Sequence, residues 1–138
     1  IPYDEDEGSC MIVIATDAPL SNRNLKRMAK RVDHAFGRVG AYSSNGSGDY
    51  AIIFSTSKPQ SSDKKSFTRK EIKNNSMNGL FIATVEATEE AIINSLFMAE
   101  TVSSKYGKME ELPVDETMKI LKKYKALNWN KKLYPWKK

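Results

Sequence analysis

The sequence contains one cysteine, Cys10, and one histidine, His34, among its 138 residues. A single cysteine excludes an internal disulfide. A structural zinc site needs three or four cysteine, histidine or carboxylate ligands at recognisable spacing, and no such pattern is present. We therefore expect no metal and no cofactor. We expect His34 to be a solvent-exposed helix residue, and Cys10 to be a buried core thiol.

Long hydrophobic runs are also absent. No stretch reaches 18 apolar residues, which argues against a membrane-spanning helix and against a membrane partner. Residues 1–8, IPYDEDEG, lack the basic start and apolar middle of a secretory signal. We predict a cytoplasmic protein, with the periplasm as the alternative because a signal could lie further upstream. The first residue is not Met, so we expect a piece of a longer polypeptide that forms one compact domain.

The net charge of +5 raises the question of nucleic-acid binding. The basic excess lies in a predicted helix at residues 22–38, in the loop 58–75 and in the C-terminal tail. No recognition motif accompanies it, and aromatic residues do not alternate with the basic ones as they do in stacking platforms. We interpret these residues as solvated surface and predict no nucleic-acid partner, with a basic nucleic-acid-binding module kept as an alternative.

The hydrophobic pattern predicts an α/β fold. Continuous apolar runs predict strands that are buried on both faces, and a 3.6-residue period predicts helices. The expected strands span residues 10–16, 50–55 and 80–85; the expected helices span residues 22–39, 88–105 and about 115–124, and a surface excursion with a short helical turn spans residues 57–78. Ser21 and Thr88 are predicted N-caps, and Gly37 and Gly40 mark the end of the helix 22–39. Three strands make an incomplete sheet, so we expect the missing strands to come from another chain or from an upstream segment.

The first candidate for chemistry is Ser9, which follows Gly8 at the entrance of the first strand. If the bond between them is cut, the Ser9 hydroxyl lies beside a free α-amino group with a pKa of about 7.7–8.0. Such an amine can act as a general base at neutral pH, so no histidine is required. Gly8 also permits backbone geometries that bring the serine oxygen close to the preceding carbonyl. The alternative is a serine that only starts a strand. As the next strand residue, Cys10 should point away from Ser9.

The second candidate is the loop Asn45-Gly46-Ser47-Gly48-Asp49. Its two glycines permit a tight bend that aims the Ser47 hydroxyl and the Asp49 carboxylate in one direction, and a plain turn is the alternative. Asn45 and Asp17 are possible residues of the site loop, although Asp17 could equally cap a turn. Tyr42 and Tyr50 flank the loop, where core packing is favoured over a role in lining a pocket.

These stretches resemble the start of the β-subunit in the L-aminopeptidase/D-amidase-esterase and β-peptidyl aminopeptidase family. The similarity runs from about Gly8 to Lys123, and the pairing of ATDAPL with NGSGD at this spacing is its most specific feature. It is carried by SCMIVIATDAPL at residues 9–20, LKR at 25–27, NGSGD at 45–49, FST at 54–56 and ATEEAI at 87–92. Some members have Glu where this chain has Asp49, so the carboxylate here reaches one methylene less far.

The resemblance implies a precursor that cuts itself between Gly8 and Ser9. Residues 1–8 would then end the α-subunit, and residues 9–138 would form the β-subunit. Ser9 would attack a substrate carbonyl and form an acyl-enzyme, while Ser47 and Asp49 contact the new amino terminus and tune its protonation. The implied activity releases small N-terminal residues from peptides, amides or esters.

The implied fold is a four-layer α/β/β/α sandwich similar to N-terminal nucleophile hydrolases but with different connectivity. The upstream α-subunit completes it and supplies much of the oxyanion hole and substrate pocket, and αβ units assemble into a homo-oligomer. An acyltransferase of the ornithine acetyltransferase type is an alternative, although those enzymes use threonine where this chain has Ser9. A degenerate, non-catalytic relative is a further alternative.

Overall fold

The computed structural model describes residues 8–58, 61–62 and 65–127. The α/β class is confirmed, but the chain separates into two compact units, one up to Ile93 and one from Asn94 onward. We had expected a single compact domain. No described side chain from residue 94 to residue 127 is buried, so this part of the second unit has no buried core of its own.

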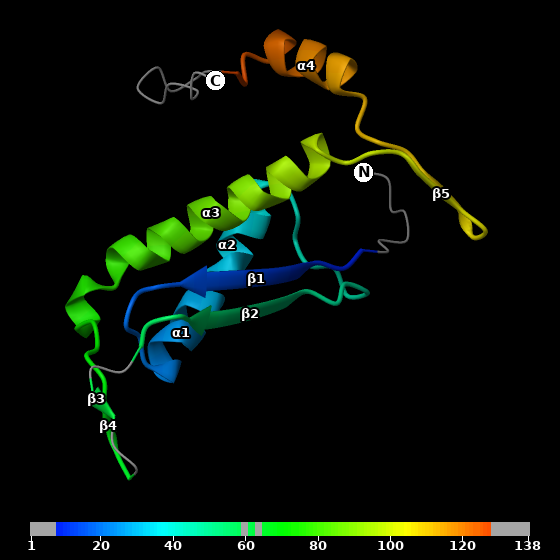
Figure 1. Ribbon diagram of the computed structural model, residues 1–138. Helices are drawn as coiled ribbons and strands as arrows, with labels where there is room; N and C mark the ends of the chain where they lie inside the picture. The colour runs from blue at the N-terminus through cyan, green and yellow to red at the C-terminus, as the bar shows by residue number, and fades with distance from the viewer. Residues whose placement is uncertain (1–7, 59–60, 63–64, 128–138) are drawn as a thin grey trace. The chain divides into compact units, whose positions relative to one another are not determined.

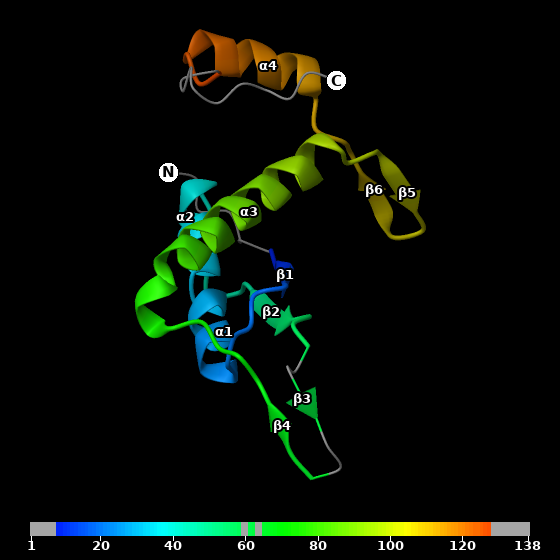
Figure 2. The same cartoon turned by 60° about the vertical axis from the view of Figure 1, so that its left-hand side comes forward.

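The centre of the first unit is a pair of parallel strands, β1 (Met11–Thr16) and β2 (Tyr50–Ser55). Both predicted strands are confirmed. The prediction that both faces of these strands are buried is wrong, because exposed and half-buried side chains alternate along each strand. Helices α1 and α2 cover one face of the pair (Figures 1 and 2). The other face carries large exposed apolar side chains and is called the open sheet face below: Met11, Val13, Tyr50, Ile52 and Phe54.

The predicted helix 22–39 is two helices, α1 (Asn22–Ala29) and α2 (Val32–Arg38). The break arises where the Arg31 N–H bonds to the carbonyl of Met28 instead of continuing the i−4 pattern. Ser21 is the N-cap of α1, as predicted, and accepts a hydrogen bond from the Asn24 N–H. Gly40, with a φ of 86°, ends α2 as predicted, because this left-handed conformation favours glycine. Gly37, also predicted to mark the helix end, lies inside α2 instead.

The predicted strand 80–85 is wrong, because these residues lie in the 20-residue helix α3 (Asn78–Phe97). A short apolar run fits a strand or a buried helix equally well by its hydrophobicity. Thr84 and Thr88 fit the helix because their hydroxyls donate to the carbonyls four residues earlier, at 2.7 Å each. Thr88 is therefore in the helix interior and is not an N-cap.

The hydrophobic core lies between the covered sheet face, α1 and the beginning of α3. Leu20 and Met77 are completely buried in it and pack with Met28. Ile53 contributes from the covered face of β2, and Phe81 contributes from α3. The core therefore uses one side of the sheet only.

The segment between β2 and α3 contains a small antiparallel hairpin and one helical turn. The hairpin strands are β3 (Ser61–Ser62) and β4 (Phe67–Thr68). The turn, η1 (Asn74–Ser76), is the short helical turn predicted for this excursion.

The second unit begins inside α3 and continues with a second hairpin, β5 (Val102–Ser104) and β6 (Gly107–Met109). The prediction that α3 extends to about residue 105 is therefore wrong. Helix α4 (Val114–Lys123) confirms the predicted last helix. The aromatic and basic tail, 129–138, lies outside the described residues. Among the residues that are described, no helix is long and apolar enough to cross a membrane.

Candidate functional site

Parallel pairing brings the two candidate motifs together. Met11 pairs with Tyr50 at the start of the strands, and the Tyr50 N–H donates to the carbonyl of Cys10 at 2.9 Å. The residues just before each strand are therefore neighbours although about 40 positions separate them in the sequence. Ser9 and Asp49 reach the same end of the sheet in this way.

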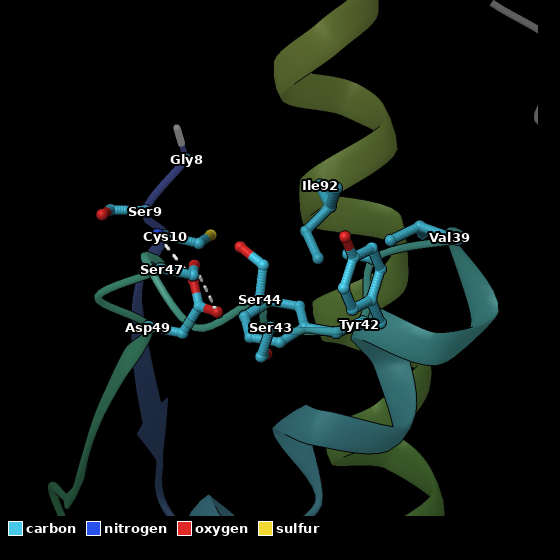
Figure 3. A pocket seen from close by; sticks show the side chains of 13 residues that line it. Gly8, Ser9, Cys10, Val39, Tyr42, Ser43, Ser44, Ser47, Asp49 and Ile92 are labelled. Atoms are coloured by element: carbon cyan, nitrogen blue, oxygen red, sulfur yellow. Dashed lines mark hydrogen bonds between the residues drawn. The ribbon is translucent and has the colours of Figure 1, made fainter. Parts of the chain in front are cut away.

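Asp49 is held by hydrogen bonds from both motifs. Its Oδ1 accepts from the Cys10 N–H at 2.9 Å, and its Oδ2 accepts from the Ser47 hydroxyl at 2.7 Å (Figure 3). Hydrogen bonds from Ser47 and then Ser43, together with the Cys10 N–H, hold the pKa of Asp49 below its ordinary value against a smaller opposing effect of burial. Asp49 is therefore a carboxylate at neutral pH.

Ser43 adopts an unusual backbone conformation in the same loop. Its φ is 52°, in the left-handed region that non-glycine residues seldom occupy. Such conformations cost about 1–3 kcal/mol and persist where surrounding contacts hold them. Here the Ser43 side chain contributes to the hydrogen bonding of Asp49. The sequence analysis did not find Ser43, because neither its type nor its neighbours predict this conformation.

The Ser9 hydroxyl oxygen accepts a hydrogen bond from the main-chain N–H of Gly48 at 3.1 Å. The side chains of Ser9 and Cys10 point in opposite directions, as the strand alternation predicted (Figure 3). Cys10 is only half-buried, so the prediction of a buried core thiol is wrong. Desolvation raises the pKa of the Cys10 thiol, and the negative charge of Asp49 raises it further.

A pocket of about 510 Å³ lies beside these residues. Ser47 and Asp49 lie on one side of it, and Val39, Tyr42 and Ile92 lie across from them, while the Ser9 hydroxyl points away from Val39 and Tyr42 (Figure 3). The complete lining consists of Gly8, Ser9, Cys10, Phe36, Val39, Gly40, Ala41, Tyr42, Ser43, Ser44, Ser47, Asp49 and Ile92. A polar wall that carries a hydroxyl and a carboxylate thus faces a wall with apolar side chains.

The structure places the remaining candidates elsewhere. Asp17, a possible residue of the site loop, follows the opposite end of β1 from Ser9, and a strand of six residues spans about 20 Å, so Asp17 is not part of this site. Asn45 is exposed in the turn before Ser47 and does not line the pocket. Tyr50 lies on the open sheet face and is 63% exposed, so the favoured prediction of core packing is wrong for this residue, and it does not line the pocket.

Two further expectations concern aromatic and basic residues. Core packing was favoured for Tyr42, but this residue is 73% exposed and lines the pocket. His34 is exposed on α2, as predicted. No group of three or more metal-ligating side chains occurs within the part of the chain that the structure describes.

Comparison with known proteins identifies the family. The model of peptidase family S58 matches residues 2–110, most of the chain. The chain belongs to peptidase family S58. The resemblance stated from the motifs is confirmed, since the β-peptidyl aminopeptidase BapA of Sphingosinicella microcystinivorans is 41% identical over 124 residues. That match covers 88% of this chain and 31% of the relative.

Solved structures agree with this assignment. A protein from Pyrococcus horikoshii OT3 is 41% identical with a TM-score of 0.73, over 82% of this chain and 33% of that one. The L-aminopeptidase D-Ala-esterase/amidase of Ochrobactrum anthropi, a variant of the Ntn hydrolase fold, is 26% identical with a TM-score of 0.72. Here the match covers 83% of this chain and 34% of the other. The S58 chain described here thus spans about a third of the length of its relatives, and its fold is related to that of Ntn hydrolases.

Proposed function

We propose that this S58 chain is the nucleophile-bearing part of a self-processing serine aminopeptidase or amidase. The polypeptide cuts itself between Gly8 and Ser9, and the released Ser9 then attacks the carbonyl of the substrate. Small N-terminal residues leave peptides, amides or esters through an acyl-enzyme on Ser9. The names of the relatives, a β-peptidyl aminopeptidase and an L-aminopeptidase D-Ala-esterase/amidase, support this class of substrate.

The observation that carries the proposal is the position of Asp49 beside the serine of the cleavage site. The carboxylate accepts a hydrogen bond from the N–H of Cys10, the residue directly after Ser9. After cleavage, the new α-ammonium group of Ser9 forms one peptide unit away from this contact. An ionised carboxylate at that distance favours the charged form of the amine and orients it, and Ser47 keeps the carboxylate in place. The amine, once neutral, is the general base for the Ser9 hydroxyl.

The open sheet face supports a second part of the proposal, an upstream α-subunit that completes a four-layer α/β/β/α sandwich. Five large apolar side chains on this face are 46–63% exposed. Apolar patches of this kind mark surfaces that another element covers. A chain that spans a third of its relatives leaves enough polypeptide for such a partner. The proposal includes association of these αβ units into a homo-oligomer.

The test is the intact mass of the polypeptide, expressed together with its proposed upstream half, for wild type and Ser9→Ala. Wild type should yield a fragment that begins at Ser9, and Ser9→Ala should stay joined and lack aminopeptidase activity. Ser103→Ala, an exposed serine on β5, is the matched control and should behave as wild type. Cleavage and activity that persist in Ser9→Ala would disprove the role of this serine.

A further inference from the structure

Gly48 approaches Ser9 more closely than any residue with a side chain could without a shift. A Cβ added to Gly48 would lie 3.3 Å from the Ser9 hydroxyl oxygen and 3.4 Å from the Tyr50 ring. The φ of Gly48 is outside the left-handed region, so its backbone conformation suits any residue. A residue with a side chain at this position would therefore press on the Ser9 oxygen and displace it by a few tenths of an ångström, so glycine is favoured by the space beside Ser9 and not by the turn. What the missing side chain permits is the 3.1 Å hydrogen bond from the Gly48 N–H to the Ser9 oxygen.

We propose that the main-chain N–H of Gly48 is a catalytic hydrogen-bond donor to the Ser9 oxygen, both in self-cleavage and in turnover. This inference rests on the proposed function of Ser9. The N–H occupies one lone pair of the oxygen and so holds the side chain in one orientation, which leaves the other lone pair for attack.

The need for such a donor is greatest before cleavage. In the intact chain the nitrogen of Ser9 belongs to the Gly8–Ser9 amide, so it is not a base. During self-cleavage the Ser9 oxygen bonds to the Gly8 carbonyl carbon, the C–N bond breaks, and the hydroxyl proton ends on the released amine. Water then hydrolyses the ester, which gives the Gly8 carboxylate and restores the Ser9 hydroxyl.

The Ser9 oxygen carries negative charge twice in this sequence. The first time is when it loses its proton on attack, and the second is when it departs from the ester. A hydrogen bond to a charged acceptor is about twice as strong as one to a neutral acceptor. The Gly48 N–H therefore stabilises both transition states more than the resting hydroxyl. The acyl-enzyme of the aminopeptidase reaction forms and breaks the same bond, so the same donor acts there.

Two variants of the full polypeptide distinguish the effect of the Gly48 N–H from the effect of the space beside the Ser9 oxygen. Glycolic acid at position 48 replaces the amide by an ester, which removes the N–H and adds no side chain. Gly48→Ala keeps the N–H and places a Cβ against the Ser9 oxygen. Gly37→Ala is the matched control, because a Cβ there meets no atom within 4 Å and its φ is also ordinary. The measurements are the single-turnover rate of cleavage at Gly8–Ser9, kcat and KM of the mature enzyme with an amino-acid amide, and the melting temperature.

The ester variant should slow cleavage and lower kcat by about tenfold with KM unchanged, because only the added strength of the hydrogen bond to the charged oxygen acts on the rate. Gly48→Ala should lose about tenfold or more, because displacement of a reacting atom by 1 Å costs about 100-fold. Gly37→Ala should match wild type. An ester variant that cleaves and turns over at the wild-type rate would overturn the inference while leaving the role of Ser9 intact. If the wild-type polypeptide neither cleaves at Ser9 nor turns over, the proposed function itself fails and the inference fails with it.

Discussion

Replacing Ile52 by lysine tests whether the open sheet face is covered by the proposed upstream subunit. Ile52 on β2 is the register partner of Val13 on β1, at the centre of this face. The two side chains are 53% and 63% exposed. Because Ile52 packs little against its own chain, a lysine there should leave the melting temperature of this chain almost unchanged.

The effect on association should be large. Complete burial of an aliphatic side chain is worth about 1.5–3 kcal/mol relative to exposure, so the exposed half of Ile52 contributes roughly 1 kcal/mol when a partner covers it. A lysine loses this gain and also places an ammonium group in an apolar interface, which costs several kcal/mol. A total of about 3–5 kcal/mol corresponds to a loss of about two to four powers of ten in affinity.

The assay is copurification of the two halves when they are expressed as separate chains, followed by size-exclusion chromatography. Ile52→Lys should abolish the complex, Val13→Ala should weaken it, and Ser103→Lys on the exposed strand β5 should leave it intact. Circular dichroism of each variant confirms that the chain is folded. Wild-type association of a folded Ile52→Lys variant would refute the reasoning and would leave the open sheet face without a partner in the upstream half.

Three of the remaining predictions concern charge, and one concerns packing. Asp49→Asn removes a carboxylate that favours the ammonium form of the Ser9 amine, so the rising limb of kcat/KM against pH should move to lower pH, and an unmoved limb would exclude this coupling. The folded-state pKa of Asp49 lies below the unfolded value of about 3.9, so its stabilising effect is present above that pH and is lost as the pH falls through the folded value. The melting temperatures of wild type and Asp49→Asn should therefore begin to approach each other near pH 4 and coincide only below the folded-state pKa. The Cys10 thiol should react slowly with iodoacetamide at pH 8 because its pKa is raised, and Asp49→Asn should speed that reaction by removing the nearby charge; equal rates would contradict the assignment. Leu20→Ala should lower the free energy of unfolding by about 2–5 kcal/mol because Leu20 is completely buried, whereas Ile82→Ala, at a position 57% exposed, should have a much smaller effect in the same denaturant titration.

The sequence predicts β1, β2 and α4 well because their local patterns have one reasonable interpretation. The apolar run at residues 80–85 has two reasonable interpretations, a strand or a buried helix, and it forms a helix in the structure. What decides is tertiary packing: Thr84, Val85 and Thr88 lie on one helical face, and all three are buried. The two threonines satisfy their hydroxyls within the helix, which removes the usual cost of burying them.

For the site, too, the sequence identifies some residues and not others. Ser9, Ser47 and Asp49 are identifiable from the sequence because their types and neighbours suggest chemistry. The opposite wall of the pocket cannot be identified from the sequence. Tyr42 and Ile92 come from separate segments, and only the packing of α3 near the end of α2 places them together. Asp17 carried the same kind of local signal as Asp49, yet it lies at the wrong end of its strand.

Strand direction explains why one carboxylate lies at the same end of the sheet as the serine and the other does not. In a parallel pair, residues that precede both strands share one end of the sheet, so Ser9 before β1 and Asp49 before β2 lie at the same end. A residue after β1, such as Asp17, must lie at the other end. The register also matters, because a slip of one residue would turn every side chain of β2 to the opposite face. The six residue pairs between β1 and β2 therefore fix the relative positions of Ser9 and Asp49. The loop between α2 and β2 supplies other residues that line the pocket.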